Sequence, residues 1–349
     1  MVKWRSLILG GVISAACLVL LLRQVDLGRT WESLTQADAG WLGLSLVTIV
    51  GALLLRFWRW QLLFLPQNRV SLRGSAVATL VGYMFNTVLP GRVGELARAS
   101  LIGHTDRVGT PRALGTIVVE KILDVLVLLV FLGILVSMLP LPEAITGAGV
   151  KASIAFGALA VAFFAAAVFR GTVVGWAARY LDPLPLLGRL HPSRTIHLVL
   201  DGADGLRRPH LLLGQLVLST ALWGVAMLTI VLTFRAFNLD VPWTAAALVL
   251  VTTNLGMTVP SAPGYLGVYH YIAVETLRLF DVEPATALAC AFVLHTVGFG
   301  SFTLAGAILL LAGLARQEYA LGDLWRWQAR PAAGDPGAGA ERPRVTQAA

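Results

Sequence analysis

The sequence predicts an all-α integral membrane protein. Three observations predict it: the composition, six long apolar runs, and two further apolar segments that proline and glycine interrupt. Of the 349 residues, 57% are hydrophobic and only 13% are charged, and the mean hydropathy is +0.76. Soluble domains carry about 25% charged residues, so this chain has too few to cover a soluble fold. The composition therefore excludes a soluble protein.

Each of the six runs is long enough to cross a membrane as a helix, which needs about 20 apolar residues. The runs are 6–22, 40–57, 114–139, 150–169, 211–234 and 285–314. Lys3 and Arg5 precede the first run, and no small-residue cleavage site follows it, so we interpret it as a retained signal-anchor. Cys17 and Cys290 stand singly inside apolar runs and predict neither a disulfide framework nor a thiolate metal site.

The runs and their linkers predict a single membrane domain over residues 1–315. Its first half covers about 1–145 and its second half about 146–315. Residues 316–349 are expected to form a cytoplasmic tail that is amphipathic or disordered, because its last part is rich in alanine, glycine and proline.

The two interrupted apolar segments are 74–103 and 243–280. The first contains Pro90 and Gly91, and proline removes a backbone donor while glycine admits strained dihedrals, so one continuous helix is not expected there. The second contains a longer break around residues 259–267. Broken backbone at membrane depth is tolerated only where protein or a water-filled cavity surrounds it. Both breaks are therefore functional candidates.

The distribution of lysine and arginine favours segments that enter and leave the membrane on the same side. Positive residues accumulate on cytoplasmic loops. With the N-terminus inside and both broken segments re-entrant, most of the 27 positive residues lie on the inner side, including Arg56, Arg59 and Arg98. The outer side then holds Arg23, Arg29, Lys151, Arg235 and Arg278. We assign the net charge of +8 to this topology and expect no nucleic acid as a partner.

This arrangement gives two halves of three spans and one broken segment each, so the second half is expected to be inserted upside down. Asn86 precedes the first break as Asn254 precedes the second, and Pro90 and Gly91 correspond to Pro260, Pro263 and Gly264. Paired interrupted segments in inverted halves are typical of transporters with a binding site near the membrane midplane.

The first break also predicts an anion site. A helix that starts after it would point free N–H groups into the broken region, and Arg92 would add a guanidinium suited to phosphate. Arg92, Glu95 and Arg98 share one helix face by their spacing of three. The alternative is that both arginines are cytoplasmic anchors paired with Glu95. In the second break, Tyr265 and its aromatic neighbours are also typical of an interfacial belt.

Three ionisable residues lie within the apolar run 114–139: Glu120, Lys121 and Asp124. Charges at membrane depth cost about 2.5–3.5 kcal/mol each on insertion scales and therefore need partners or water. Glu120 and Asp124 share a helix face, and Arg92 and Arg98 are their expected partners. The alternative is that the three residues lie at the inner interface. The histidines His104, His270 and His295 are expected to be packing residues without a metal.

The interrupted motifs resemble a known family. Residues 86–99 (Asn-Thr-Val-Leu-Pro-Gly-Arg-Val-Gly-Glu-Leu-Ala-Arg-Ala), 120–124 (Glu-Lys-Ile-Leu-Asp) and 260–269 (Pro-Ser-Ala-Pro-Gly-Tyr-Leu-Gly-Val-Tyr) are similar to the three signatures of the lysylphosphatidylglycerol synthase transmembrane-region, or flippase-domain, family. The resemblance covers about residues 1–315 and implies a multi-pass protein of the bacterial inner membrane, with both termini cytoplasmic, that handles lipid-linked polar headgroups. Only about 35 residues follow, so no C-terminal synthase domain is expected.

We therefore expect a lipid flippase or transporter-like protein that binds an anionic or lipid-linked headgroup, with no catalytic residue and no cofactor or metal. Membrane lipids are the expected partners, either phospholipids or polyprenyl or hopanoid lipids, and the oligomeric state stays open. Two alternatives remain. One is a membrane enzyme or enzyme subunit in lipid, hopanoid or lipid-linked sugar modification, with Glu95, Glu120 or Asp124 as general base. The other is a structural partner that recruits soluble enzymes.

Overall fold

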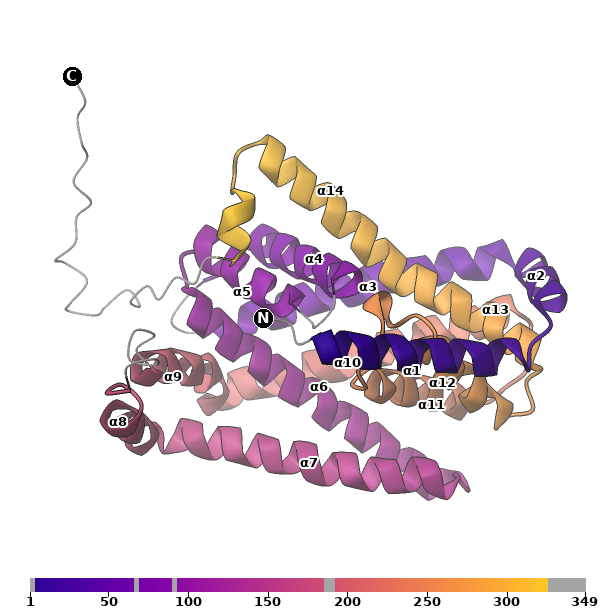
Figure 1. Cartoon of the computed structure of the whole chain (residues 1–349), viewed down its shortest axis with the longest axis horizontal. Helices are drawn as coiled ribbons and strands as arrows, with labels where there is room; N and C mark the ends of the chain where they lie inside the picture. The colour runs from indigo at the N-terminus through magenta and orange to yellow at the C-terminus, as the bar shows by residue number, and fades with distance from the viewer. Residues whose placement is uncertain (1–3, 66–68, 90–92, 185–191, 326–349) are drawn as a thin grey trace.

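Helices make up the regular structure of the described chain, which covers residues 4–65, 69–89, 93–184 and 192–325 of a computed structural model. No strand occurs in those ranges, so the prediction of an all-α protein is confirmed. The longer helices run along the long axis of the molecule, while α2 lies at one end of that axis and α8 and α9 lie at the other (Figure 1).

In chain order the elements are α1 (Trp4–Leu22), α2 (Leu27–Gln36), α3 (Ala39–Phe64), α4 (Leu72–Val88), α5 (Gly94–Thr105), α6 (Thr110–Met138), α7 (Glu143–Val168), α8 (Arg170–Tyr180), α9 (Pro192–Leu200), η3 (Asp201–Arg207), α10 (Pro209–Ala236), α11 (Trp243–Gly256), η4 (Pro263–Tyr265), α12 (Val268–Arg278), α13 (Pro284–His295), η5 (Thr296–Gly300), α14 (Ser301–Ala315) and η6 (Leu321–Trp325).

Short polar residues fix the start of the early helices. The carboxylates of Asp26 and Asp38 accept hydrogen bonds from the first backbone N–H groups of α2 and α3. The hydroxyl of Ser71 does the same for α4. Because the first N–H groups of a helix have no partner within the helix, such caps stabilise it and set where it begins.

Four helices of the described chain are long and apolar enough to cross a membrane: Ala39–Phe64, Ile145–Val168, Pro209–Ala236 and Pro284–Ala315. The bent pair Ile8–Leu22 and Leu27–Gln36, with an angle of 85° between its helices, makes five if it is counted as one span. The remaining predicted span, 114–139, coincides with most of helix α6, but α6 is not among these candidate membrane-spanning helices. Six spans thus remain a prediction.

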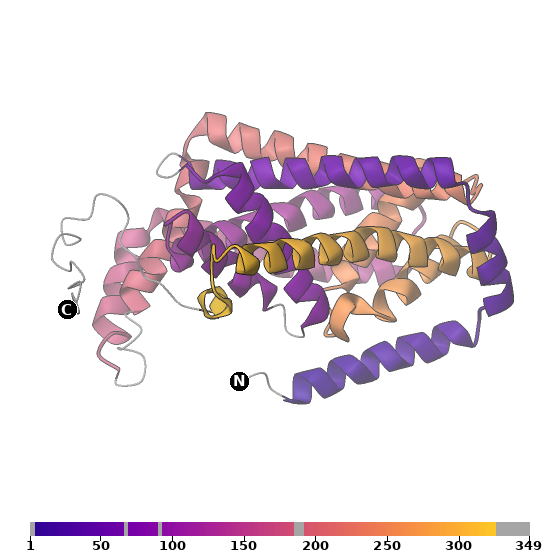
Figure 2. The ribbon, with the colours of Figure 1, turned by 90° about the horizontal axis from the view of Figure 1, so that it is seen from above.

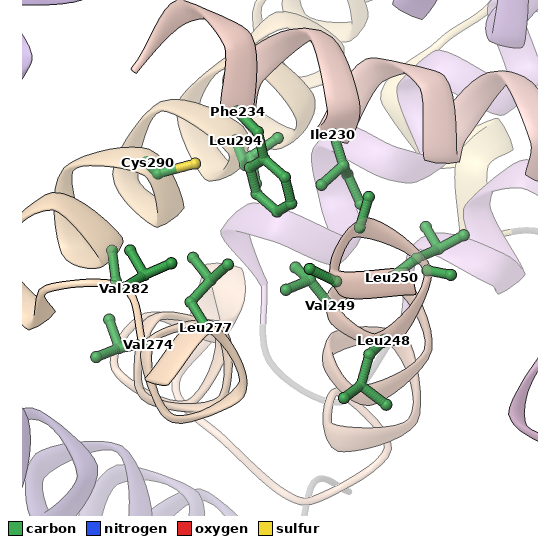
Figure 3. Packing of buried hydrophobic residues seen from close by; sticks show 14 of the residues in the cluster. Ile230, Phe234, Leu248, Val249, Leu250, Val274, Leu277, Val282, Cys290 and Leu294 are labelled. Carbon is green, nitrogen blue, oxygen red and sulfur yellow. The ribbon is translucent and has the colours of Figure 1, made fainter. Parts of the chain in front are cut away.

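Similar apolar composition serves opposite purposes in α7 and α11. Few residues of α7 are buried, and its apolar side chains point outward, as for Ile154, which is 68% exposed. In α11 every residue from Thr244 to Val251 is buried. Leu248, Val249 and Leu250 belong to one apolar cluster with side chains of α10, α12 and α13 (Figure 3). A helix that is apolar all round is buried in protein or lipid, and here α11 is the central helix.

Both interrupted segments form pairs of short helices that pack against each other. The first pair is α4 and α5, followed by the long α6; the second is α11 and α12, followed by α13 to α14. The first pair lies nearer the end of the molecule with α8, and the second nearer the end with α2 (Figures 1 and 2). After each pair the connection turns through a residue with positive φ, Arg107 at 57° and Asp281 at 57°.

The α4–α5 pair depends on glycine at its contact point. A Cβ at Gly94 would collide with the backbone carbonyl of Gly82 and with the side chain of Asn86. Lipid tails are as apolar as the side chains of a bundle, so helices in membranes associate mainly through close packing at small residues. Gly94 therefore sets how closely the two short helices approach.

We expect Gly94→Ala to destabilise the protein, because overpacking costs about 1–3 kcal/mol. The matched control is Gly43→Ala in α3, where a Cβ would meet nothing within 4 Å. That control should be neutral or slightly stabilising, since alanine favours a helix over glycine. Thermal unfolding of the detergent-purified variants measures both effects. Equal melting temperatures for the two variants would contradict the packing argument.

Candidate functional site

A network of buried charges connects α3, α5 and α6. Arg59 of α3 lies 2.5 Å, through Nη1, from Asp124 Oδ1 and 3.2 Å, through Nη2, from Glu120 Oε1. Both carboxylates come from α6, one helical turn apart, and therefore face the same neighbour. Arg59 is 1% exposed and Glu120 is fully buried. These charges lie inside the protein, paired with one another.

Arg98 of α5 completes the network from the other side. Its Nη2 lies 2.8 Å from Glu120 Oε2, and its guanidinium lies over the Trp60 ring at 3.7 Å from the centroid. Among the described residues, neither Glu120 oxygen accepts a hydrogen bond of ordinary geometry, so charge attraction to two arginines holds this carboxylate. Cation–π contacts of desolvated arginine add about 2 kcal/mol.

Helix α10 supports the network with neutral donors and acceptors. Trp223 Nε1 donates to Asp124 Oδ1 at 3.1 Å, and Arg59 Nη1 donates to the Ser219 hydroxyl at 3.1 Å. Gln215 Nε2 donates to the backbone carbonyl of Arg59 at 2.9 Å. Because a buried charge is costly unless it is paired and hydrogen-bonded, these contacts are what permit the network at this depth.

The pairing differs from the sequence prediction in one respect. Arg98 was expected to serve Glu120 or Asp124, and it pairs with Glu120. Asp124 instead pairs with Arg59, which lies beyond the end of the predicted span 40–57. That end was wrong, because α3 extends to Phe64 and Arg59 lies within it. The placement of Arg56 and Arg59 on the inner side stays a prediction.

A pocket of about 250 Å³ opens beside the network. Both broken segments contribute to its wall. Its lining comprises Arg56, Tyr83, Asn86, Thr87, Glu95, Lys121, Asp124, Val125, Leu128, Trp223, Asn254, Leu255, Met257, Thr258, Tyr265, Phe299 and Phe302. Charged and amide side chains come mainly from the first half of the chain, and aromatic and aliphatic ones mainly from the second.

Five polar side chains of the pocket lining contact one another, three in one group and two in another. Lys121 Nζ lies 3.3 Å from Glu95 Oε1, and Asn86 Nδ2 donates to the same oxygen at 3.3 Å. Arg56 Nη1 donates to the Tyr83 hydroxyl at 2.6 Å and lies 3.9 Å from Glu120. Glu95 stands in the first turn of α5, where a helix dipole favours a negative charge.

The second break turns through backbone with positive φ and is held by two side chains, those of His295 and Ser14. Gly264, Tyr265 and Gly267 all have positive φ, at 69°, 58° and 83°. Such backbone persists only where surrounding contacts determine it. His295 Nε2 bonds to the Gly264 carbonyl at 2.7 Å, and the Ser14 hydroxyl accepts from the Ala262 N–H at 2.8 Å.

Those contacts give Tyr265 its place in the pocket wall. A Cβ on Gly264 would also lie in contact with Thr87, close to the first break. The Tyr265 ring packs against the Phe299 ring at a tilt of 50°, with 5.6 Å between ring centroids. His295 was expected to be a packing residue, and its ring also stacks on Phe299, but its bond to the break makes it a positioning contact as well.

The predicted site residues fall into five groups. Pro90, Gly91 and Arg92 lie outside the described residues. Those that line the pocket are Asn86, Glu95, Lys121, Asp124, Asn254 and Tyr265. Arg98 and Glu120 lie behind it in the buried network, and Gly264 packs in the second break. Pro260 and Pro263 are exposed and are not among the lining residues.

Sequence reasoning missed Arg56, Arg59, Tyr83 and Trp223. The available signal was that Arg56 and Arg59 are spaced by three and flanked by apolar residues on both sides. The predicted span 40–57 includes Arg56 but ends before Arg59, whereas α3 continues to Phe64. As for metals, the described residues contain no group of three or more His, Cys, Asp or Glu side chains placed to hold an ion.

The network predicts strong energetic coupling between Arg59 and Asp124. Removing one partner of a buried ion pair costs about 3–5 kcal/mol, because the other charge is left uncompensated. Arg59→Ala and Asp124→Ala should each destabilise the protein by that order, and the double variant should lose clearly less than the sum.

The matched control is the exposed pair Arg29 and Glu283, whose side chains are 68% and 50% exposed. Exposed pairs contribute about 0–1 kcal/mol, so their double-mutant cycle should show little coupling. Thermal or denaturant unfolding in detergent measures both cycles. Additive losses for Arg59 and Asp124 would show that the two residues act independently.

Comparison with known proteins agrees with the motifs. Residues 7–306 match the family described as the lysylphosphatidylglycerol synthase TM region. The chain is 24% identical over 316 residues to a UPF0104 membrane protein of Methanothermobacter thermautotrophicus, covering 85% of this chain and 91% of the relative. It is 20% identical over 229 residues to a UPF0104 membrane protein of Methanocaldococcus jannaschii, covering 64% and 92%.

No solved structure matches the chain significantly. The family match nevertheless spans most of the chain, including both broken helices and the charged network between them. The chain therefore belongs to the lysylphosphatidylglycerol synthase TM-region family of multi-pass membrane proteins.

Proposed function

We propose that this protein is a lipid transporter that binds an anionic headgroup in the pocket between its two broken helices. The proposal is based on one observation: Arg56 has no close carboxylate partner. Glu120 pairs with Arg98, Asp124 with Arg59, and Glu95 with Lys121. Among the described cations of the network, Arg56 is the one without such a pair. It donates a hydrogen bond to the Tyr83 hydroxyl and lies 3.9 Å from Glu120.

A cation at the wall of a pocket whose nearest carboxylate lies 3.9 Å away and is shared with two other arginines favours an anionic ligand. Arg56 is largely buried, with its side chain 17% exposed, so water screens its charge only in part. A guanidinium presents several donors in a planar fork, which suits phosphate oxygens. A phosphate in the pocket would supply the missing counter-charge.

The apolar part of the pocket lining supports a lipid as the ligand. Leu255, Met257, Phe299 and Phe302 add apolar and aromatic surface to the lining that also carries the charged side chains. A ligand with a charged end and an apolar body would find partners for both parts in this pocket. Membrane lipids have that composition, whether phospholipids or polyprenyl or hopanoid lipids, and an apolar pocket with a few converging polar groups is typical of a ligand site.

We further propose that the two halves form an inverted repeat. Three features support it: each half contains a broken pair packed on itself, each pair precedes a long helix, and each turn after the pair contains a residue with a φ of 57°. The proposed orientation places α8, α9 and both termini in the cytoplasm of a bacterial cell. Arg170, Arg179, Arg194, Arg207 and Arg208 then lie on the inner side.

Labelling at the two equivalent turns tests this orientation. In a background without Cys17 and Cys290, Thr105→Cys should react with a membrane-impermeant maleimide only after the cells are opened. Leu279→Cys should react in intact cells. Both positions are exposed at the end of the second helix of their pair. Reaction of both cysteines from the same side would show that the halves are not inverted.

Transport is tested with purified protein in liposomes that contain an anionic phospholipid with a fluorescent headgroup. We expect the wild type to move the lipid between leaflets faster than protein-free vesicles. Arg56→Gln should abolish most of this rate, because it removes the charge. Arg56→Lys should retain part of it, because lysine keeps the charge but loses the fork.

Arg29→Gln is the matched control, since it removes an exposed arginine far from the pocket lining and should transport like wild type. Thermal unfolding of each variant confirms that the comparison concerns folded protein. If wild-type vesicles move no lipid and the protein instead turns over a lipid-linked donor, the enzyme alternative replaces transport.

A further inference from the structure

Glu95 holds an unusual position, because it is a carboxylate at the surface of a pocket that otherwise suits an anion. Four charged side chains line the pocket: Arg56, Glu95, Lys121 and Asp124. Asp124 forms an ion pair with Arg59, which lies outside the pocket lining, and accepts a hydrogen bond from the Trp223 N–H. Both described partners of Glu95, Lys121 and Asn86, are residues of the pocket lining.

The contacts of Glu95 are one-sided. Oε1 contacts both Lys121 Nζ and the amide of Asn86, each at 3.3 Å. Oε2 is buried and has no hydrogen-bond partner among the described residues. The carboxylate therefore engages two donors of the pocket lining through one oxygen, while its buried second oxygen has no donor among the described residues.

This arrangement limits the negative charge that the pocket accepts. Arg56 makes the longest ion pair of the network, 3.9 Å to Glu120. Four described cations (Arg56, Arg59, Arg98 and Lys121) face three carboxylates (Glu95, Glu120 and Asp124), which leaves one net positive charge. A ligand with one negative charge neutralises it. A second negative charge would lie close to Glu95, and like charges in contact at a recognition site cost several kcal/mol.

We propose that Glu95 is a specificity-determining residue that selects lipids with a single phosphate charge, such as phosphodiesters, against phosphomonoesters and diphosphates. The inference rests on the proposed function, since it concerns the ligand of the same pocket. It adds a repulsive element to the attractive one, and discrimination between similar ligands commonly uses both.

The test compares two lipids that differ in charge and little else. Phosphatidylmethanol is a diester with one negative charge. Phosphatidic acid is a monoester that carries close to two at about pH 8, because the second pKa of a phosphate monoester is about 6. Binding of each lipid to the purified full chain in mixed micelles is measured by microscale thermophoresis.

We expect the wild type to bind phosphatidylmethanol at least about tenfold more tightly than phosphatidic acid, and Glu95→Gln to remove or reverse this preference by raising the affinity for phosphatidic acid. Glutamine keeps the size of the side chain and a hydrogen bond to Asn86.

Asn86→Asp is the converse variant: it adds a negative charge beside Glu95 and should weaken binding of phosphatidic acid most. Glu275→Gln makes the same charge change at a glutamate paired with Arg278, outside the pocket, and should leave the preference unchanged.

The outcomes separate the inference from the function on which it rests. If the wild type binds neither lipid, or if Arg56→Gln leaves binding of both unaltered, the proposed function fails. If both lipids bind through Arg56 but Glu95→Gln leaves their ratio unchanged or weakens both equally, Glu95 is a structural partner of Lys121 and this inference alone is overturned. The Asn86→Asp result decides the question if Glu95→Gln does not fold.

Discussion

The double contact of Arg59 with Glu120 and Asp124 is the constraint on which the rest of the structure depends. Glu120 and Asp124, two carboxylates on one face of α6, are buried away from water and therefore need cationic partners. Arg59 of α3 forms an ion pair with each of them. Arg98 brings α5 to the same point, and the side chains of Trp223 and Ser219 bring α10. Four helices are thereby fixed in rotation as well as position, because each contact requires a particular side of its helix.

That fixed frame gives the broken helices their place. Helix α5 can begin inside the protein because Arg98 and the contact at Gly94 hold it against α6 and α4. The second break relies on different means, since its three left-handed residues are held by His295 of α13 and Ser14 of α1. One wall of the pocket is thus held by charge and the other by hydrogen bonds to strained backbone. Strained backbone of this kind is concentrated at functional sites in proteins.

Sequence signals predicted the features that are local in the chain and missed those that depend on rotation between helices. Proline and glycine in an apolar run mark a break directly, and three charges in five residues of α6 mark a buried network. Arg56 and Arg59 are equally embedded, but they lie near the end of an apolar run, where arginine is also the ordinary anchor of a loop. The choice of Glu120 as the partner of Arg98 depends on how three helices meet, which spacing along one helix does not specify. The bond between His295 and Gly264 joins residues that are distant in sequence, so the histidine looked like packing alone.

The two halves resemble each other in layout and differ in chemistry, and the difference has a physical reason. A pocket with charges on both walls would need carboxylates or water to neutralise each cation, and every added ion raises the cost of desolvation at this depth. The ions of α3 to α6 lie close together and neutralise one another except for one net positive charge. That charge is available to a ligand through Arg56, which has the longest ion-pair distance of the network. The wall formed by the second break then needs only Tyr265 and its aromatic neighbours, which pack on an apolar body without adding charge. Under the proposed inverted repeat, the two broken segments would be equivalent elements that line one pocket. The first would bind the charged headgroup of the lipid, and the second would bind its apolar part.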